Sequence, residues 1–261
     1  MKKILLTGIT LGLFGIASAA EYNNYADAFS AGSNAHKAKN YQTMRSAFEQ
    51  AKKLAKTDGE KWNALFFEIK ALREMKKWDD SLKLLDDYLA EENPERFKFA
   101  MIFVKGLVFN SKGDPAKGAA LIEEALKCPE LFGYMKEQAQ NILINYYYQQ
   151  KDYDKCAARA ETVISEGKSG KPAVDSARFF LAQCRYDQKK YEECRKLVKE
   201  FTPIVEAASL KSRMAYLQAQ LHRLNSEYED AIRQFELSIK YEPNGWRAAD
   251  AKRFIKKLQE Q

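Results

Sequence analysis

The sequence predicts an all-α solenoid, meaning a row of stacked helical hairpins, and three observations lead to this prediction. First, an aromatic residue or a proline opens an amphipathic segment six times, at intervals of 37, 37, 38, 38 and 37 residues. Second, small residues recur at fixed distances on both sides of each of these anchor residues. Third, prolines separate one unit from the next. The six anchors are Tyr41, Trp78, Pro115, Tyr153, Tyr191 and Tyr228.

The residues that follow each anchor predict a helix with one buried face. Three positions after the anchor the side chain is usually small, and seven positions after it a mostly bulkier apolar residue follows, which is the spacing of one helix face. Nine positions before the anchor the residues are again mostly small, so two helices can approach closely there and form an antiparallel hairpin. The residues at +3 are Met44, Ser81, Gly118, Cys156, Cys194 and Ala231, those at +7 are Phe48, Leu85, Ile122, Ala160, Val198 and Phe235, and those at −9 are Gly32, Ile69, Gly106, Ile144, Ala182 and Ala219.

The ends of the units follow from proline and glycine. We expect the second helices to end at five prolines, because proline removes a backbone donor and clashes with the preceding turn. In the first unit Asp58-Gly59 is the expected break, and Pro115 is expected in the first turn of a helix capped by Asp114. The five prolines are Pro94, Pro129, Pro172, Pro203 and Pro243.

The pattern resembles the tetratricopeptide repeat over residues 22–261. The clearest copy runs from Glu227 to Phe235 and on through Ser238 to Pro243. The resemblance implies a right-handed α-solenoid of about six tetratricopeptide-type hairpins. The expected units are 25–60, 61–97, 98–135, 136–173, 174–210 and 211–244, within a repeat region of residues 21–261.

The segment 245–259 is expected to be a C-terminal capping helix. It places Trp246, Ala249, Phe254 and Leu258 in one apolar stripe among Arg and Lys residues. Terminal repeats must cover an exposed apolar face, which favours a cap. A helix lying on a membrane surface is the alternative.

Residues 1–20 have the three parts of a secretory signal peptide. Lys2 and Lys3 are followed by an apolar run of about thirteen residues, shorter than the roughly 20 that cross a bilayer, and then by small residues ending at Ala20. We expect cleavage after Ala19 or Ala20 and export to the periplasm of a bacterium or to the medium. The mature chain is expected to carry no membrane span.

The charge balance argues against a nucleic-acid partner. The chain has 43 Lys and Arg against 36 Asp and Glu, and without Lys2 and Lys3 the excess is 41 − 36, or about +5. Both signs are interleaved, so we expect a solvated surface and no nucleic-acid binding.

The resemblance also implies where a partner would bind, because in that family the first helices line the concave surface that receives peptides. Twelve residues before the anchors five of six side chains are aromatic, and polar residues follow on the same face. Rings would supply apolar area and amides would bond a peptide backbone. The expected groove residues are Phe29, Phe66, Phe103, Asn141, Asn145, Gln149, Phe179, Gln183, Tyr216 and Gln220. For the four phenylalanines, packing between repeats is the alternative interpretation.

Four cysteines leave three possibilities open. An exported protein with an even number of cysteines is expected to form disulfides. Cys184 and Cys194 are one candidate pair within a hairpin, Cys156 and Cys184 are a second pair between units, and four reduced cysteines are the third possibility.

We expect no catalysis, metal or cofactor. His36 and His222 lie in opposite terminal units, and the cysteine spacing is not that of a zinc site. The sequence therefore favours an exported scaffold that binds another protein or peptide, with envelope assembly or division as the setting. The alternative is a structural subunit of a larger envelope or secretion complex that uses its convex and capping surfaces. The oligomeric state is not encoded in any pattern of the sequence.

Overall fold

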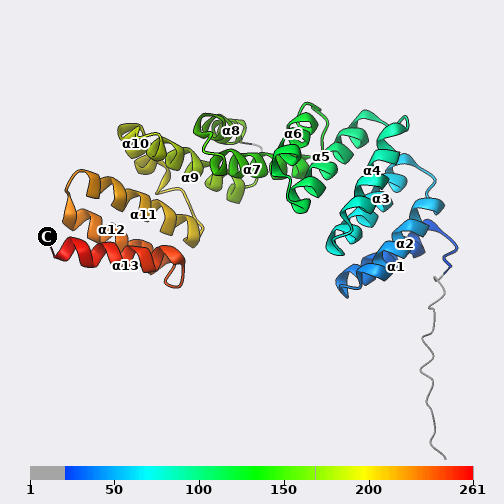
Figure 1. The fold of residues 1–261 in the computed structure, drawn as a ribbon, viewed down its shortest axis with the longest axis horizontal. Coiled ribbons are helices and arrows are strands. Elements are labelled where there is room, and N and C mark those ends of the chain that lie inside the picture. Colours follow the sequence, from blue (N-terminus) through cyan, green and yellow to red (C-terminus); the bar gives the residue numbers. More distant parts are fainter. Residues whose placement is uncertain (1–20, 168, 261) are drawn as a thin grey trace, which may run out of the picture. The chain divides into compact units, whose positions relative to one another are not determined.

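The computed structural model describes residues 21–167 and 169–260, so the expected signal peptide 1–20 lies outside the described residues. Thirteen α-helices and no strands make up this part of the chain (Figure 1). The helices are α1 (Tyr25–Lys37), α2 (Tyr41–Leu54), α3 (Asp58–Glu74), α4 (Trp78–Ala90), α5 (Glu95–Lys112), α6 (Pro115–Ala125), α7 (Gly133–Gln149), α8 (Tyr153–Glu166), α9 (Lys171–Asp187), α10 (Tyr191–Phe201), α11 (Ala208–Leu224), α12 (Tyr228–Tyr241) and α13 (Trp246–Gln259). The predicted all-α solenoid of helical hairpins is confirmed.

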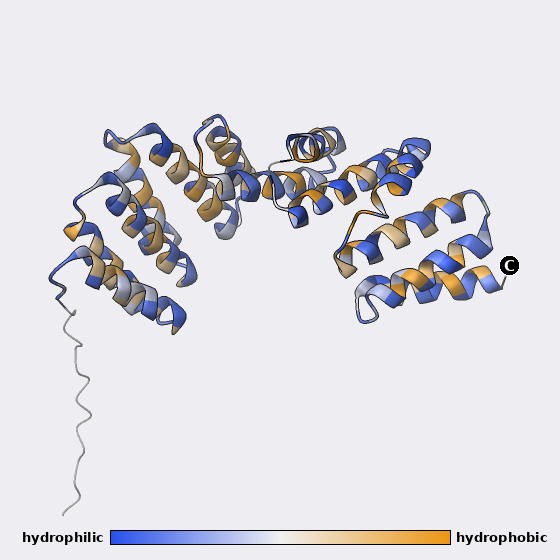
Figure 2. Ribbon diagram, turned by 180° about the vertical axis from the view of Figure 1, so that it is seen from behind, coloured by the Kyte–Doolittle hydropathy of each residue, from blue (hydrophilic) through white to orange (hydrophobic). Residues whose placement is uncertain are grey.

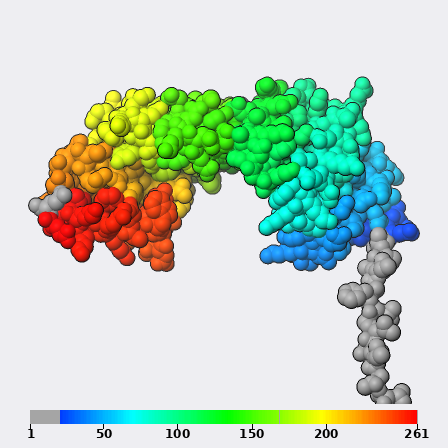
Figure 3. Space-filling view, viewed as in Figure 1, coloured from blue at the N-terminus to red at the C-terminus, as the bar shows by residue number. Residues whose placement is uncertain are grey.

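The chain divides into two compact units, which are described separately. Unit 1 ends at Leu84 and contains α1 to α3 with the first half of α4. Unit 2 begins at Leu85 and contains the remaining helices to α13. Within unit 2, side chains fill the space between successive hairpins, as the green, yellow and red regions of Figure 3 show.

Each anchor residue is the first residue of the second helix of a hairpin, and the turn before it has one repeated geometry. Two positions before the anchor the backbone is left-handed, at Lys39, Lys76, Gly113, Lys151, Lys189 and Ser226. The next residue donates its N–H to a carbonyl five positions earlier, as Asp152 does to Tyr147 at 2.9 Å. This is the Schellman ending of a helix, which usually takes glycine. Only Gly113 adopts it without the strain that a Cβ imposes.

The core contains the residues that the repeat pattern predicts. Every residue at +3 and +7 of an anchor is buried, and so is every residue at −9. In Figure 2 the apolar faces of paired helices turn toward each other within the hairpins. The repeating sequence pattern therefore identifies the buried face of each hairpin.

In two of the hairpins, a glycine lets the first and second helix come close together. A Cβ on Gly106 of α5 would lie 2.7 Å from Ile122 Cγ1 and 2.9 Å from the carbonyl oxygen of Gly118 on α6. A Cβ on Gly32 of α1 would lie 2.7 Å from the ring of Phe48 on α2. The predicted contact between small residues is confirmed for Gly106 and Gly118, whereas Gly32 makes room for the large ring of Phe48.

The breaks between hairpins differ in detail from the prediction. Asp58 and Gly59 begin α3, so the first break lies just before them. Pro172 lies in the first turn of α9 and Pro94 caps α5, so both prolines start helices instead of ending them. Proline fits there because the first helical N–H groups have no partner in the helix. Asp114 caps α6 by accepting the Lys117 N–H at 3.0 Å, as predicted.

Helix α13 covers the end of unit 2 with a different stripe from the predicted one. Ala251 and Leu258 are buried against α11 and α12, and Phe254 stacks on Phe235 of α12 with ring centroids 5.4 Å apart. Trp246 is 68% exposed. The helix is therefore a cap, and its apolar face is covered by protein.

Candidate functional site

The first helix of the fourth hairpin, α7, lines a surface cavity of unit 2. The cavity has a volume of about 610 Å³ and is bordered by Asn110 of α5 and Pro115 of α6 on its other side. We name it the α7 groove. Its α7 residues include Tyr134, Glu137, Gln138, Asn141, Ile142, Asn145, Tyr146 and Gln149.

These residues fall on one face of α7, because their spacing follows the i, i+3, i+4, i+7 pattern of a helix face. From Tyr134 to Gln149 the helix rises about 22 Å at 1.5 Å per residue. An extended peptide advances about 3.3 Å per residue, so about six or seven residues match this length.

The α7 groove carries little charge. Among the described residues, Glu137 is the one carboxylate that lines it, and no Lys or Arg does. One oxygen of Glu137 accepts the backbone N–H of Gly170 at 2.9 Å, so part of its acceptor capacity is already used. The groove therefore presents amides and phenols to a ligand.

An aromatic cluster lies at one end of the α7 groove. Tyr134 is 56% exposed and lies 5.9 Å from the ring of Phe132. Phe97 stacks on Phe132 at 6.2 Å, and the Arg96 guanidinium lies 3.9 Å from the centre of the same ring. Burial raises the pKa of Tyr134, so its phenol stays protonated at neutral pH and can donate a hydrogen bond.

The amides of α7 keep free hydrogen-bonding groups. Asn145 donates one N–H to the carbonyl of Asn141 at 2.8 Å, which leaves its own oxygen as an acceptor. Asn145 and Gln149 are exposed, and Asn141 is partly exposed. The structure thus brings three predicted groove residues together on an open surface.

In unit 1 the predicted residues Phe29 and Phe66 are partly buried in aromatic clusters. Phe29 meets Phe48 and Phe67 edge to face at 5.1 and 5.6 Å. Phe66 stacks on Trp62 at 5.5 Å. Most of their area is used for packing within unit 1.

For Phe103 and Phe179 the groove interpretation is wrong. Phe103 is 1% exposed and Phe179 is 3% exposed, so both rings belong to the core of unit 2. The guanidinium of Arg213 lies 5.4 Å from the centre of the Phe179 ring. Packing between repeats, the alternative interpretation, applies to both.

The predicted residues of α9 and α11 are occupied by contacts within unit 2. Gln183 donates to Asp187 at 3.1 Å, and Gln220, which is 8% exposed, accepts from Arg223 at 3.0 Å. Tyr216 donates its hydroxyl hydrogen to Asp250. Amides and rings at the same repeat position therefore have different surroundings in each hairpin.

The four cysteines are free thiols and are all buried. The candidate bond between Cys184 and Cys194 is absent. Instead, a hydrogen bond with Cys156, together with burial, raises the pKa of Cys184. The neighbour of Cys184 across α8 and α9 is therefore Cys156, because a second helix packs on the next first helix, but no disulfide joins the two residues. The structure has the third possibility, four reduced cysteines.

The sequence analysis missed two carboxylates that tie successive hairpins together. Sixteen residues before the anchor, Glu137 of α7 and Asp175 of α9 each accept a backbone N–H from the loop after their own hairpin. For Asp175 this N–H belongs to Glu206, at 3.4 Å. A comparison of the repeats at the position sixteen residues before each anchor would have identified both carboxylates.

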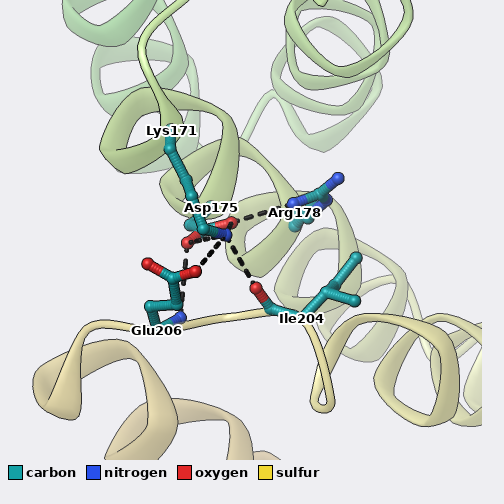
Figure 4. A network of polar contacts seen from close by, with 5 residues as sticks. All are labelled: Lys171, Asp175, Arg178, Ile204 and Glu206. Carbon is teal, nitrogen blue, oxygen red and sulfur yellow. Dashed lines mark hydrogen bonds and ion pairs between the residues drawn. The ribbon is translucent and has the colours of Figure 1, made fainter.

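Asp175 is the more buried of the two, at 2% exposure. Arg178 donates to one of its oxygens at 2.9 Å, and the Lys171 ammonium lies 3.3 Å from the other (Figure 4). Lys171 also donates to the carbonyl of Ile204 at 2.8 Å. The network thus joins α9 to the loop between α10 and α11.

Of the described residues that line the α7 groove, none is His, Cys, Ser or Lys. Among the described residues, no group of three or more His, Cys, Asp or Glu is placed to hold a metal ion. In the same part of the chain, every helix is too short or too polar to span a bilayer. What the groove offers chemically is hydrogen bonding and aromatic contact.

The fold and the α7 groove define a helical-repeat protein whose architecture is consistent with a protein-interaction scaffold. Residues 143–199, from α7 to α10, match the family described as Tetratricopeptide repeat. No curated protein sequence matches the chain.

Solved structures show the same fold. The structure reported as the functional characterization of Pseudomonas aeruginosa pilF is 11% identical, with a TM-score of 0.61, over 87% of this chain and 96% of that one. The Cut9 and Hcn1 hetero-tetramer structure of the APC/C gives 10% identity and a TM-score of 0.57 over 90% of this chain and 42% of that one. A putative kinesin light chain with TPR-like repeats from Podosopora anserina gives 10% and 0.53 over 72% and 97%. At these identities the similarity establishes the tetratricopeptide-type fold alone.

Proposed function

We propose that this protein is an exported scaffold that binds an extended, uncharged segment of a partner protein in the α7 groove. The setting that we propose is bacterial envelope assembly or division. The observation that carries the proposal is the row of exposed amides on one face of α7, together with the exposed phenol of Tyr134.

The chemistry of the groove favours a peptide backbone as its ligand. Side-chain amides offer both donors and acceptors, which match the alternating N–H and C=O groups of an extended chain. The aromatic cluster around Phe132 supplies apolar area for one bulky side chain of the partner. Of the described residues that line the groove none is Lys or Arg, so an acidic segment would find a positive charge only at the end where Arg96 lies against Phe132.

Export is supported by the order of features in residues 1–20. A basic start, a short apolar run and small residues up to Ala20 are the parts that a signal peptidase substrate needs. Intact mass measurement of the protein from a bacterial periplasmic fraction tests this proposal, with Ala20 or Glu21 as the expected first residue. A chain that keeps Met1 in that fraction would contradict it.

The binding proposal can be tested with peptides selected from a random display library on the purified mature protein. We expect the selected peptides to be uncharged over about six residues, and the doubly substituted variant Asn141→Ala, Asn145→Ala to bind them at least tenfold more weakly in calorimetry. Each lost hydrogen bond weakens the binding free energy by about 1 kcal/mol, so two lost hydrogen bonds weaken binding by at least about tenfold.

The matched control is Gln42→Ala, which removes an exposed amide from the second helix α2. We expect it to bind the selected peptides as the unsubstituted protein does. Equal binding by the Asn141 and Asn145 double variant, with unchanged circular dichroism, would reject the α7 groove as the binding surface.

A second candidate function is supported by the capping helix. Trp246 is the most exposed of the exposed large apolar side chains and lies at the start of α13. An exposed tryptophan at the end of a repeat array is typical of an interface with another subunit. In that case Trp246→Ala would abolish co-purification with envelope partners, and the Asn141 and Asn145 substitutions would not.

A further inference from the structure

Two arginines of unit 2 are held side by side by the packing of α11 and α13. Helix α12 is antiparallel to both neighbours, so α11 and α13 run in the same direction (Figure 1). Tyr216 of α11 donates a hydrogen bond to Asp250 of α13, which sets the register of the two helices. Arg213 and Arg247 each lie three residues before one member of this pair, so the same register places them on matching turns of α11 and α13, and the charge of Arg213 acts on Arg247.

In the described part of the chain, neither of these two arginines forms an ion pair. Among the described residues, no carboxylate lies within 4.0 Å of either guanidinium, although Glu242 acts on Arg247 from farther away. Asp250 is already bonded by Tyr216 and by Arg253. Two like charges at close range repel each other, so this arrangement costs free energy in the unbound protein.

Both guanidiniums are also partly withdrawn from water. The Nε of Arg213 is buried and makes no hydrogen bond within the chain, while its guanidinium lies over Phe179. Arg247 lies 4.4 Å from the ring centre of Trp246, and burial together with Arg213 lowers the pKa of Arg247. A buried N–H donor without an acceptor is costly and is normally satisfied by a partner.

We propose that Arg213 and Arg247 form a binding site for a carboxylate, and that the ligand is an acidic side chain of a partner protein. Two guanidiniums match the planar, bidentate geometry of a carboxylate. The exposed indole of Trp246 next to Arg247 adds apolar area that a peptide uses and that a small free anion does not. The proposal rests on the scaffold function and adds a second, charged contact to the neutral α7 groove.

The test uses fluorescein-labelled hexaglutamate as the probe, with hexaglutamine and hexalysine as comparison peptides, in fluorescence anisotropy at low ionic strength. We expect the mature protein to bind hexaglutamate at least tenfold more tightly than the other two peptides. Arg213→Gln and Arg247→Gln should each weaken this binding at least fivefold, and the double variant should abolish it.

Arg233→Gln is the matched control, because it removes one positive charge from an exposed arginine of α12 that is paired with Asp230. It should change hexaglutamate binding less than twofold. An equal loss in this variant would overturn the proposal, since binding would then depend on net charge alone. Displacement of hexaglutamate by micromolar inorganic phosphate would also overturn it, in favour of a free-anion site.

The hexaglutamate experiment can fail or succeed independently of the peptide-binding test of the α7 groove. The Asn141 and Asn145 double variant should bind hexaglutamate normally, because the arginines lie on other helices. If the Asn141 and Asn145 double variant binds the selected peptides as well as the unsubstituted protein does, while hexaglutamate binding still depends on Arg213, the groove proposal fails and the arginine site stands. If the double variant binds the selected peptides more weakly but Arg213→Gln leaves hexaglutamate binding unchanged, only the arginine site is rejected.

Discussion

The substitution Gly106→Ala tests whether close approach of two helices determines the hairpin geometry. In an exposed helix interior, alanine stabilises by about 1 kcal/mol relative to glycine. At Gly106, however, the new methyl group would lie 2.7 Å from Ile122 Cγ1 and 2.9 Å from the Gly118 carbonyl oxygen. The second contact is with backbone, so α5 and α6 must move apart.

Overpacking of this kind lowers the free energy of unfolding by about 1–3 kcal/mol. Because α5 and α6 must move as whole helices, we expect a loss toward the upper end of this range. The clash therefore outweighs the helix propensity, and we expect a net loss of about 1–2 kcal/mol. At about 2–4 °C per kcal/mol for a unit of this size, the melting temperature should fall by about 2–8 °C. Urea unfolding followed by far-ultraviolet circular dichroism measures the same loss as a lower midpoint.

The control for this experiment is Gly133→Ala at the start of α7. A Cβ at Gly133 meets no atom within 4 Å, so this variant should be as stable as the unsubstituted protein or slightly more stable. If Gly106→Ala behaved like Gly133→Ala, the close contact between α5 and α6 would not control the packing of this hairpin, and our reasoning about small residues would be wrong.

Two further predictions concern buried carboxylates. Asp175→Ala should destabilise unit 2 by about 2–3 kcal/mol, because it removes the acceptor of Arg178 and of the Glu206 N–H and one of the partners of Lys171. Asp230→Ala on the exposed surface should cost less than about 0.5 kcal/mol in the same denaturation assay. Equal losses would show that burial of Asp175 contributes nothing. In unit 1, burial raises the pKa of Glu68 although Lys52 opposes the shift, so the stabilising protonated form is present at low pH and is lost as the pH rises through the folded-state pKa. The stability of the unsubstituted protein relative to Glu68→Gln should therefore improve as the pH falls from 7 to 4, and a change in the other direction would mean that the ion pair outweighs burial.

The hairpin array follows from the sequence because its signals are local. Helix periodicity places Met44 and Phe48 on one face, and the repeat interval places the same pattern in every hairpin. The six anchors consequently start the second helices that the structure shows. The left-handed turn residues escaped prediction because five of the six are lysine or serine, where glycine is the usual signal.

The candidate site could be predicted only in part, because exposure depends on how neighbouring hairpins pack. Phe103 and Asn141 hold the same position in their repeats, yet Phe103 is buried and Asn141 faces the α7 groove. Burying an amide without hydrogen-bond partners costs more free energy than burying an aromatic ring. The predicted groove residues with amide side chains are therefore found on the surface more often than the predicted phenylalanines. The Arg213 and Arg247 pair had no sequence signal, since the two residues come from different elements.

The sequence by itself determined the helical class, the period, the hairpin register and the apolar face of each helix, because these depend on contacts between residues close in the chain. Only the tertiary structure decided which first-helix side chains remain open to a ligand. It also decided that Cys184 lies beside Cys156 and that Arg213 and Arg247 have no carboxylate within 4.0 Å among the described residues. These features depend on the distance and register between helices that are far apart in the sequence, and side-chain periodicity along one helix carries no information about them.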